Sequence, residues 1–137
     1  MPYLIDTDWT IDHLANVPDA VQLLNELADD GIAISVVTYM EVYQGIVRDP
    51  KRADLLFQFE SFLAGVPIVP FSLAVARQCA NLRADLKRHG KKVNSRALDL
   101  MIAATAIEHN LILVTRNTSD YQDIPNLKLY QFGNASE

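Results

Sequence analysis

Oxygen-bearing side chains recur at four places along this 137-residue chain, and together they could hold a metal ion. These places hold Asp6 and Asp8, then Glu41, then Asp99, and finally Asn117 and Asp120. Converging carboxylates repel one another unless a cation lies among them, and oxygen ligands suit hard ions such as Mg²⁺ or Mn²⁺. Such ions could activate water and stabilise the charge that develops on a phosphodiester under in-line attack.

Other kinds of catalytic site find little support in the sequence. The three histidines, His13, His89 and His109, are far apart, and the lone Cys79 has no partner nearby, so a zinc site is a poor interpretation. The five glycines are isolated, which excludes the common phosphate-binding glycine loops. No G-x-S-x-G nucleophile motif is present.

Each acidic residue also has a purely structural interpretation. Thr38 and Glu41 have the spacing of a helix capping box. Asp99 would be stabilised by the helix dipole in the first turn of a helix. Asp6 or Asp8 could cap a short helix, and Asp120 could belong to a turn before a proline. Recurrence of acids at successive strand ends is what favours the functional interpretation.

The elements that must position these residues alternate along the chain. Apolar runs predict strands at 2–5, 32–37, 66–71, 111–115 and 127–132. Helical spacing predicts helices that end near 28, start at Thr38, cover 55–62, run from Ser72 to Gly90, and run from Asn94 or Ser95 to His109. This pattern predicts one α/β domain over 1–137, a three-layer α/β/α fold with a mainly parallel sheet of about five strands. Active sites in such folds gather beyond the carboxyl ends of the strands.

Charge and composition limit the classes of function and the cellular compartment that fit this chain. The net charge of -5 argues against a general nucleic-acid coat. Half of the 12 basic residues nevertheless lie between Arg83 and Arg96, and this strip could contact a nucleic-acid backbone or be a solvated helix face. The single cysteine fits a core position in a reducing cytoplasm. No signal peptide is visible, and the longest apolar run, 101–107, is far below the ~20 residues that span a bilayer.

Four segments of the chain, taken together, resemble the PIN-domain ribonucleases, most closely the VapC-type toxins of toxin–antitoxin pairs. The segments are YLIDTD at 3–8, TYMEV at 38–42, LDLMIAATA at 98–106 and LVTRNTSDY at 113–121. The resemblance implies a PIN-like fold and a Mg²⁺- or Mn²⁺-dependent endoribonuclease that acts on single-stranded RNA. It also implies a homodimer and a cognate antitoxin protein as partner.

The same resemblance implies roles for particular residues. It makes Asp6, Glu41 and Asp99 the carboxylates of the metal site, with Asn117 or Asp120 as the fourth ligand and Asp120 as a further catalytic acid. Asp8 departs from the Asn or Ser usual at that position and could add a ligand or cap a helix. The candidate RNA contacts are Lys87, Lys91, Lys92, Arg96 and Arg116.

Two other functions remain open at this point. The run D-x-D-x-T at 6–10 resembles the opening of haloacid-dehalogenase-like phosphotransferases, in which Asp6 would be the nucleophile. Their later paired-acid motif is missing between Thr115 and Tyr121. The second alternative is a non-catalytic module of the same fold that binds an antitoxin or RNA.

Overall fold

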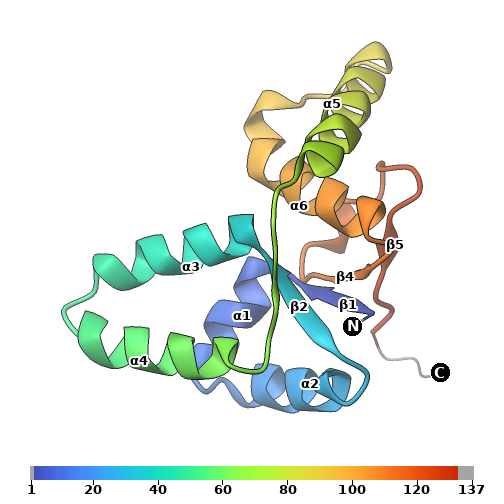
Figure 1. The fold of residues 1–137 in the computed structure, drawn as a ribbon. Helices are drawn as coiled ribbons and strands as arrows, with labels where there is room; N and C mark the ends of the chain where they lie inside the picture. Colours follow the sequence, from blue (N-terminus) through green and yellow to red (C-terminus); the bar gives the residue numbers. More distant parts are fainter. Residues whose placement is uncertain (1, 133–137) are drawn as a thin grey trace.

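A five-stranded parallel sheet forms the centre of the molecule, in a computed structural model that describes residues 2–132. The strands are β1 (Tyr3–Ile5), β2 (Ile32–Ser35), β3 (Ile68–Val69), β4 (Ile112–Val114) and β5 (Lys128–Leu129). Their order across the sheet is β3-β2-β1-β4-β5, and every neighbouring pair is parallel (Figure 1). The predicted parallel sheet of about five strands is therefore confirmed.

Helices cover both faces of this sheet. They are α1 (Thr7–Leu14), α2 (Pro18–Ala28), α3 (Val36–Val47), α4 (Arg52–Leu63), α5 (Leu73–Arg88) and α6 (Ala97–Glu108). Two 3₁₀ segments, η1 (Asn94–Arg96) and η2 (Thr118–Asp120), precede α6 and follow β4. Helices α5 and α6 lie on one side of the sheet and α1, α2 and α4 on the other (Figure 1). Within residues 2–132, none of the helices has the length and hydropathy needed to cross a membrane.

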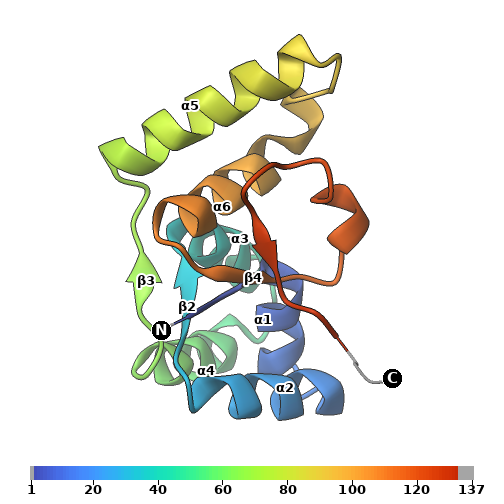
Figure 2. The same cartoon turned by 90° about the vertical axis from the view of Figure 1, so that its right-hand side faces the viewer.

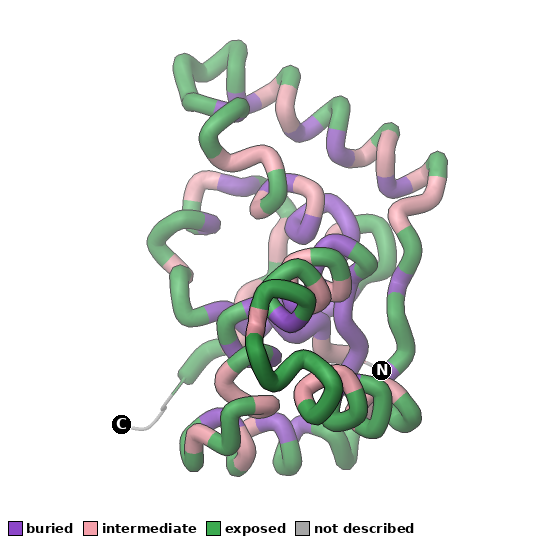
Figure 3. The backbone as a smooth tube through the Cα atoms, turned by 90° about the vertical axis from the view of Figure 1, so that its left-hand side faces the viewer, coloured by how far each residue is buried: buried purple, intermediate pink, exposed green. Residues whose placement is uncertain are grey.

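Alternating side chains of the strands supply two separate cores. Leu4 and Leu113 pack towards α5 and α6, whereas their neighbours Ile5 and Val114 pack with α1 to α4. This alternation is what strands covered on both faces require. The buried stretches run through the middle of the fold (Figure 3). Cys79 lies in the first core, as predicted.

The junction between β2 and α3 differs from the prediction. The second strand ends at Ser35, and α3 starts at Val36 rather than at Thr38. The Ser35 hydroxyl accepts a hydrogen bond of 3.0 Å from the backbone N–H of Thr38 and so caps the helix. The capping box of Thr38 and Glu41 is therefore wrong, and Glu41 is free to face another element.

Other boundaries also differ, and the strand predicted at 127–132 is only Lys128–Leu129. The stretch 66–71 contributes only Ile68 and Val69 to the sheet, since Pro67 and Pro70 have no N–H to donate to a strand ladder. Residues 94–96 form η1 instead of a cap, and α6 begins at Ala97 without a side-chain cap at its start. Asp99 still falls in the first turn of α6, as predicted.

Candidate active site

Asp6 lies where β1 passes into α1, at the carboxyl edge of the sheet. Its backbone N–H donates to the carbonyl of Val114 on the neighbouring strand at 2.9 Å. Its carboxylate caps α1 by accepting from the Thr7 N–H at 2.8 Å, and also accepts from the Thr115 hydroxyl at 2.7 Å. Only 5% of Asp6 is exposed. The Asp6 carboxylate therefore caps α1 with one oxygen and contacts the segment after β4 with the other.

Neighbouring negative charges surround Asp6 and Asp99. The pKa of Asp6 is raised to about 6, mainly because the group is buried; the charges of Asp99 and Asp8 contribute to this rise, and the hydrogen bonds from Thr115 and Thr7 oppose it. Burial also raises the pKa of Asp99, with Asp120 and Asp8 adding to the rise. These acids come from the start of α1, from α6 and from η2, and a cation would relieve their mutual repulsion.

Glu41 reaches the same edge from α3. Its Oε1 accepts a hydrogen bond of 2.6 Å from the Thr7 hydroxyl, and the hydroxyls of Thr7 and Thr38 are 3.0 Å apart. Because the Thr7 backbone also donates to Asp6, this one residue connects the two carboxylates. The buried threonines restrict the orientation of both acids.

Tyr121 places a hydroxyl among the acids. The residue is 1% exposed, and its buried hydroxyl has no hydrogen-bond partner in the described part of the chain. Its pKa is raised, first by burial and then by the charges of Asp6, Asp99 and Glu41. The hydroxyl interacts with the Asp99 carboxylate, so the buried phenol lies against the acids of this edge.

The segment after β4 brings in the remaining candidates. The Asn117 amide donates to the Asp8 carboxylate at 3.3 Å, and Asp120 is exposed on η2. All the candidate donors are oxygen-bearing, as Mg²⁺ and Mn²⁺ prefer. Within residues 2–132, no three Asp, Glu, His or Cys side chains are grouped tightly enough to hold an ion as they stand.

The candidate RNA contacts fall into two groups. Lys87, Lys91 and Lys92 are exposed at the end of α5 and in the segment that follows it. That segment lies on the same side of the molecule as the segment after β4 (Figure 2). The two arginines instead form ion pairs, Arg96 with Asp123 and Arg116 with Asp12.

Arg116 is held against α1. Its guanidinium carbon lies 3.7 Å from the centre of the Trp9 ring, and Nη2 donates to Asp12 at 2.9 Å. These contacts combine the stacking on an aromatic face that is characteristic of arginine with a single charged hydrogen bond. They anchor the chain just before Asn117.

Four residues of the site were not singled out from the sequence. Thr7, Thr115 and Tyr121 lie inside the segments that carry the family resemblance, and their polar side chains next to acids were a usable signal. Asp123 carried no such signal, because its partner Arg96 is 27 residues away. Only the packing of distant segments reveals this pair.

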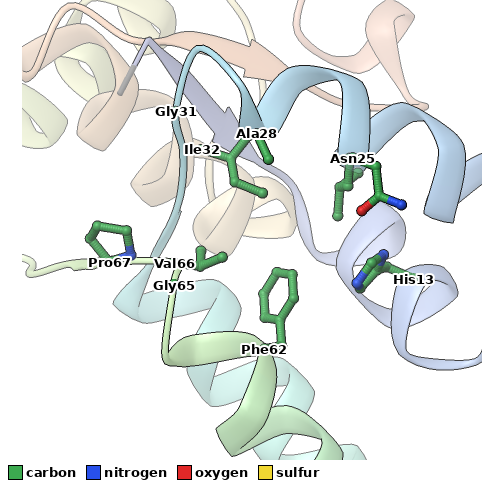
Figure 4. Close-up of a pocket in the computed structure, with 10 residues that line it drawn as sticks. His13, Asn25, Ala28, Gly31, Ile32, Phe62, Gly65, Val66 and Pro67 are labelled. Carbon is green, nitrogen blue, oxygen red and sulfur yellow. The ribbon is translucent and has the colours of Figure 1, made fainter.

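A hollow of about 510 Å³ lies elsewhere, beside the start of β2 and the end of α4. Figure 4 shows His13, Asn25 and Phe62 around it, together with Ile32 at the start of β2. Burial lowers the pKa of His13, which favours the neutral ring. The hollow contains none of the candidate acids, so it has no part in their chemistry.

Comparison with known proteins agrees with this geometry. The PIN domain family matches residues 3–126. The chain is 30% identical to ribonuclease VapC2 of Rickettsia felis, over 94% of this chain and 96% of that protein. It is 29% identical to the tRNA(fMet)-specific endonuclease VapC of Shigella flexneri, over 93% and 96%. It is 32% identical to ribonuclease VapC19 of Mycobacterium tuberculosis, over 91% and 96%.

Solved structures give the same result for the fold. The VapBC2 complex of Rickettsia felis, bound to a DNA fragment from its promoter, superimposes with a TM-score of 0.86 at 28% identity, covering 97% of this chain and 100% of that one. FitAcB of Neisseria gonorrhoeae gives 0.79 at 28% identity, covering 94% and 96%. The PIN assignment replaces the haloacid-dehalogenase-like alternative. The chain belongs to the PIN-domain family and, within it, to the VapC-type ribonuclease toxins of type II toxin–antitoxin systems.

Proposed function

We propose that this ribonuclease cleaves single-stranded RNA with the help of Mg²⁺ or Mn²⁺ held at the carboxyl edge of the sheet. The observation that carries the proposal is the convergence of three carboxylates at this edge. Thr7 donates to both Asp6 and Glu41, and Asp99 lies close enough for its charge to raise the pKa of Asp6. Such carboxylates repel one another unless a cation lies among them, and they are the donors that a hard cation would take.

Asp6, Glu41 and Asp99 would hold the ion, with Asn117 or Asp120 as the fourth ligand. When bound, the ion supplies an activated water and neutralises charge on the phosphodiester. The chain's own contribution is to orient the carboxylates. Thr7 donates to both Asp6 and Glu41, which limits their rotation. We propose that one domain over 1–137 carries this activity, in the cytoplasm.

The metal requirement is tested by incubating the full chain with single-stranded RNA. We expect internal cleavage that EDTA abolishes and that Mn²⁺ or Mg²⁺ restores, because charge development on the phosphate would otherwise go unstabilised. Undiminished cleavage in EDTA would contradict the metal requirement. An inert protein that still binds RNA would favour the non-catalytic module.

We propose that Lys87, Lys91 and Lys92 guide the RNA backbone towards the acids. Lys91 lies close enough to Asp123 for its charge to lower the pKa of that carboxyl. The basic strip is therefore next to the segment after β4. Arg116 would contribute beside Asn117 if RNA displaced Asp12 from its guanidinium.

Replacing Lys91 and Lys92 together by Gln should weaken RNA binding and leave the metal requirement unchanged. Each lost phosphate contact should reduce the log–log salt slope by about 0.7–1, since fewer counterions are released. A salt titration of RNA affinity measures this. The control pair Lys51→Gln and Arg52→Gln changes exposed basic residues at the start of α4 and should leave the slope unaltered. An unchanged slope in the Lys91 and Lys92 variant would identify the strip as solvated surface.

We propose that the protein binds a cognate antitoxin, as the VapBC2 and FitAcB complexes of its relatives suggest, and that it also forms a homodimer. Several apolar side chains remain exposed, including Met40 at 45%, Phe57 at 71% and Leu73 at 69%. Exposed apolar surface is characteristic of interaction sites. Light scattering at micromolar concentration should give twice the chain mass, and a strict monomer would contradict the dimer.

A further inference from the structure

Arg96 makes three hydrogen bonds at the start of α6. Its Nη1 and Nη2 donate to the two carboxylate oxygens of Asp123 at 2.9 and 2.8 Å, and Nη2 also donates to the backbone carbonyl of Asp120 at 2.6 Å. The side chains of Arg96 and Asp123 are only 19% and 27% exposed. A two-pronged pair of this kind fixes orientation as well as distance.

The two partners belong to segments that each carry candidate metal ligands. Arg96 lies three residues before Asp99 in the chain, at the end of η1. Asp120 and Asp123 lie at the end of and just beyond η2, in the segment that also carries Asn117. The Arg96 contacts therefore join the start of α6 to the far end of the segment after β4.

The near end of the same segment is already attached to α1. Thr115 donates to Asp6 at 2.7 Å, and the Asn117 amide donates to Asp8 at 3.3 Å. With Arg96 holding the far end, the segment is tied on one side to α1 and on the other to α6. The spacing between its own oxygen ligands and Asp99 then depends on the Arg96 contacts.

Arg96 is poorly placed to bind RNA directly. Two of its nitrogens are engaged by Asp123, so a phosphate would have to displace a carboxylate already bound at 2.8–2.9 Å. By contrast, Lys91 and Lys92 are exposed. The charge of Arg96 also lies near Asp99 and Asp120, with which it interacts favourably.

We propose that Arg96 is a positioning residue for the metal site: its pair with Asp123 sets the distance between the segment that carries Asn117 and Asp120 and the acid Asp99. This inference rests on the proposed metal site. Outer contacts that orient metal ligands typically change metal affinity by about 10-fold to 100-fold when removed.

The test measures Mn²⁺ affinity of the full chain by calorimetry, without RNA. Arg96→Gln and Asp123→Asn should each weaken Mn²⁺ binding about tenfold or more. The double variant should bind Mn²⁺ no more weakly than either single variant, because both substitutions break the same ion pair. Arg96→Lys keeps the positive charge but cannot donate two parallel hydrogen bonds to the Asp123 carboxylate, so it should also weaken Mn²⁺ binding.

The sign of the effect separates this role from two others. If Arg96 acts only through its charge, Arg96→Gln will strengthen Mn²⁺ binding, because a repelling cation is removed. If Arg96 contacts RNA, Arg96→Gln will leave Mn²⁺ affinity unchanged and lower RNA affinity, while Asp123→Asn will not lower RNA affinity. Either result overturns the proposal.

Two control variants complete the design. Arg88→Gln breaks the exposed pair of Arg88 with Asp85 at the end of α5 and should leave Mn²⁺ affinity unchanged. Asp99→Asn should abolish Mn²⁺ binding; if it does not, the metal site itself is wrong. If Asp99→Asn loses binding and Arg96→Gln keeps it, only the positioning role fails. Circular dichroism establishes that each variant is folded.

Discussion

Asp6→Asn and Asp99→Asn are each expected to slow RNA cleavage by about 10³-fold or more in protein that remains folded. A metal ion stabilises the charge of such a transition state by several kcal/mol, and about 4 kcal/mol corresponds to roughly 10³ in rate. Asn keeps the shape of the side chain but removes the negative charge. In Asp6→Asn the amide oxygen can still accept from the Thr7 N–H, so the cap of α1 survives.

The rate is measured under single turnover with saturating Mn²⁺. Asp19→Asn is a matched control, because Asp19 also lies in the first turn of a helix, α2, but is exposed outside the site. It should keep the full rate. Wild-type rates in folded Asp6→Asn and Asp99→Asn proteins would refute the assignment of these acids.

The metal-free protein is expected to lose stability as the pH rises from about 4 to about 7. Asp6 has a pKa of about 6 in the folded protein against 3.8 as a free group, and the pKa of Asp99 is also raised. The folded state therefore binds more protons than the unfolded state in this range, so the free energy of unfolding falls with rising pH. A two-unit difference at the nearly buried Asp6 corresponds to roughly 3 kcal/mol.

Urea unfolding in EDTA across this pH range measures the effect. His13 contributes an opposite slope, because its lowered pKa costs stability as the pH falls. The difference between wild type and Asp6→Asn removes that contribution, and Asp6→Asn should be the more stable protein at pH 7. Mn²⁺ should reverse the wild-type slope, since it binds the deprotonated carboxylates. Parallel curves for wild type and Asp6→Asn would show that Asp6 is not desolvated.

The sequence alone was sufficient to predict the architecture and the edge of the sheet on which the acids lie. Apolar runs alternate with helical spacing, and this local pattern predicts a parallel sheet with helices on both faces. In such a sheet, residues that end successive strands lie at one edge. Asp6 at the end of β1 and Asp120 beyond β4 follow from that rule, because strand position and direction are encoded locally.

The orientation of Glu41 was decided by tertiary structure. The β-branched Val36 and Val37 favour a strand, and the prediction extended the strand through them. The Ser35 cap starts the helix earlier, which removes the capping box and leaves Glu41 to pair with Thr7. Strand propensity and the cap favour opposite structures for residues 36 and 37. The difference in free energy between them is too small to predict from the local sequence.

The sequence also does not predict which acidic side chains are buried or which charged residues form long-range ion pairs. Asp6 and Asp120 are the same residue type, but Asp120 lies on the surface whereas only 5% of Asp6 is exposed. Burial is the main reason that the pKa of Asp6 is raised to about 6. The sequence predicts Arg96 as an RNA contact but gives no sign of its ion pair with Asp123. Desolvation and ion pairing depend on which distant segments pack together, and no spacing along the chain specifies that contact.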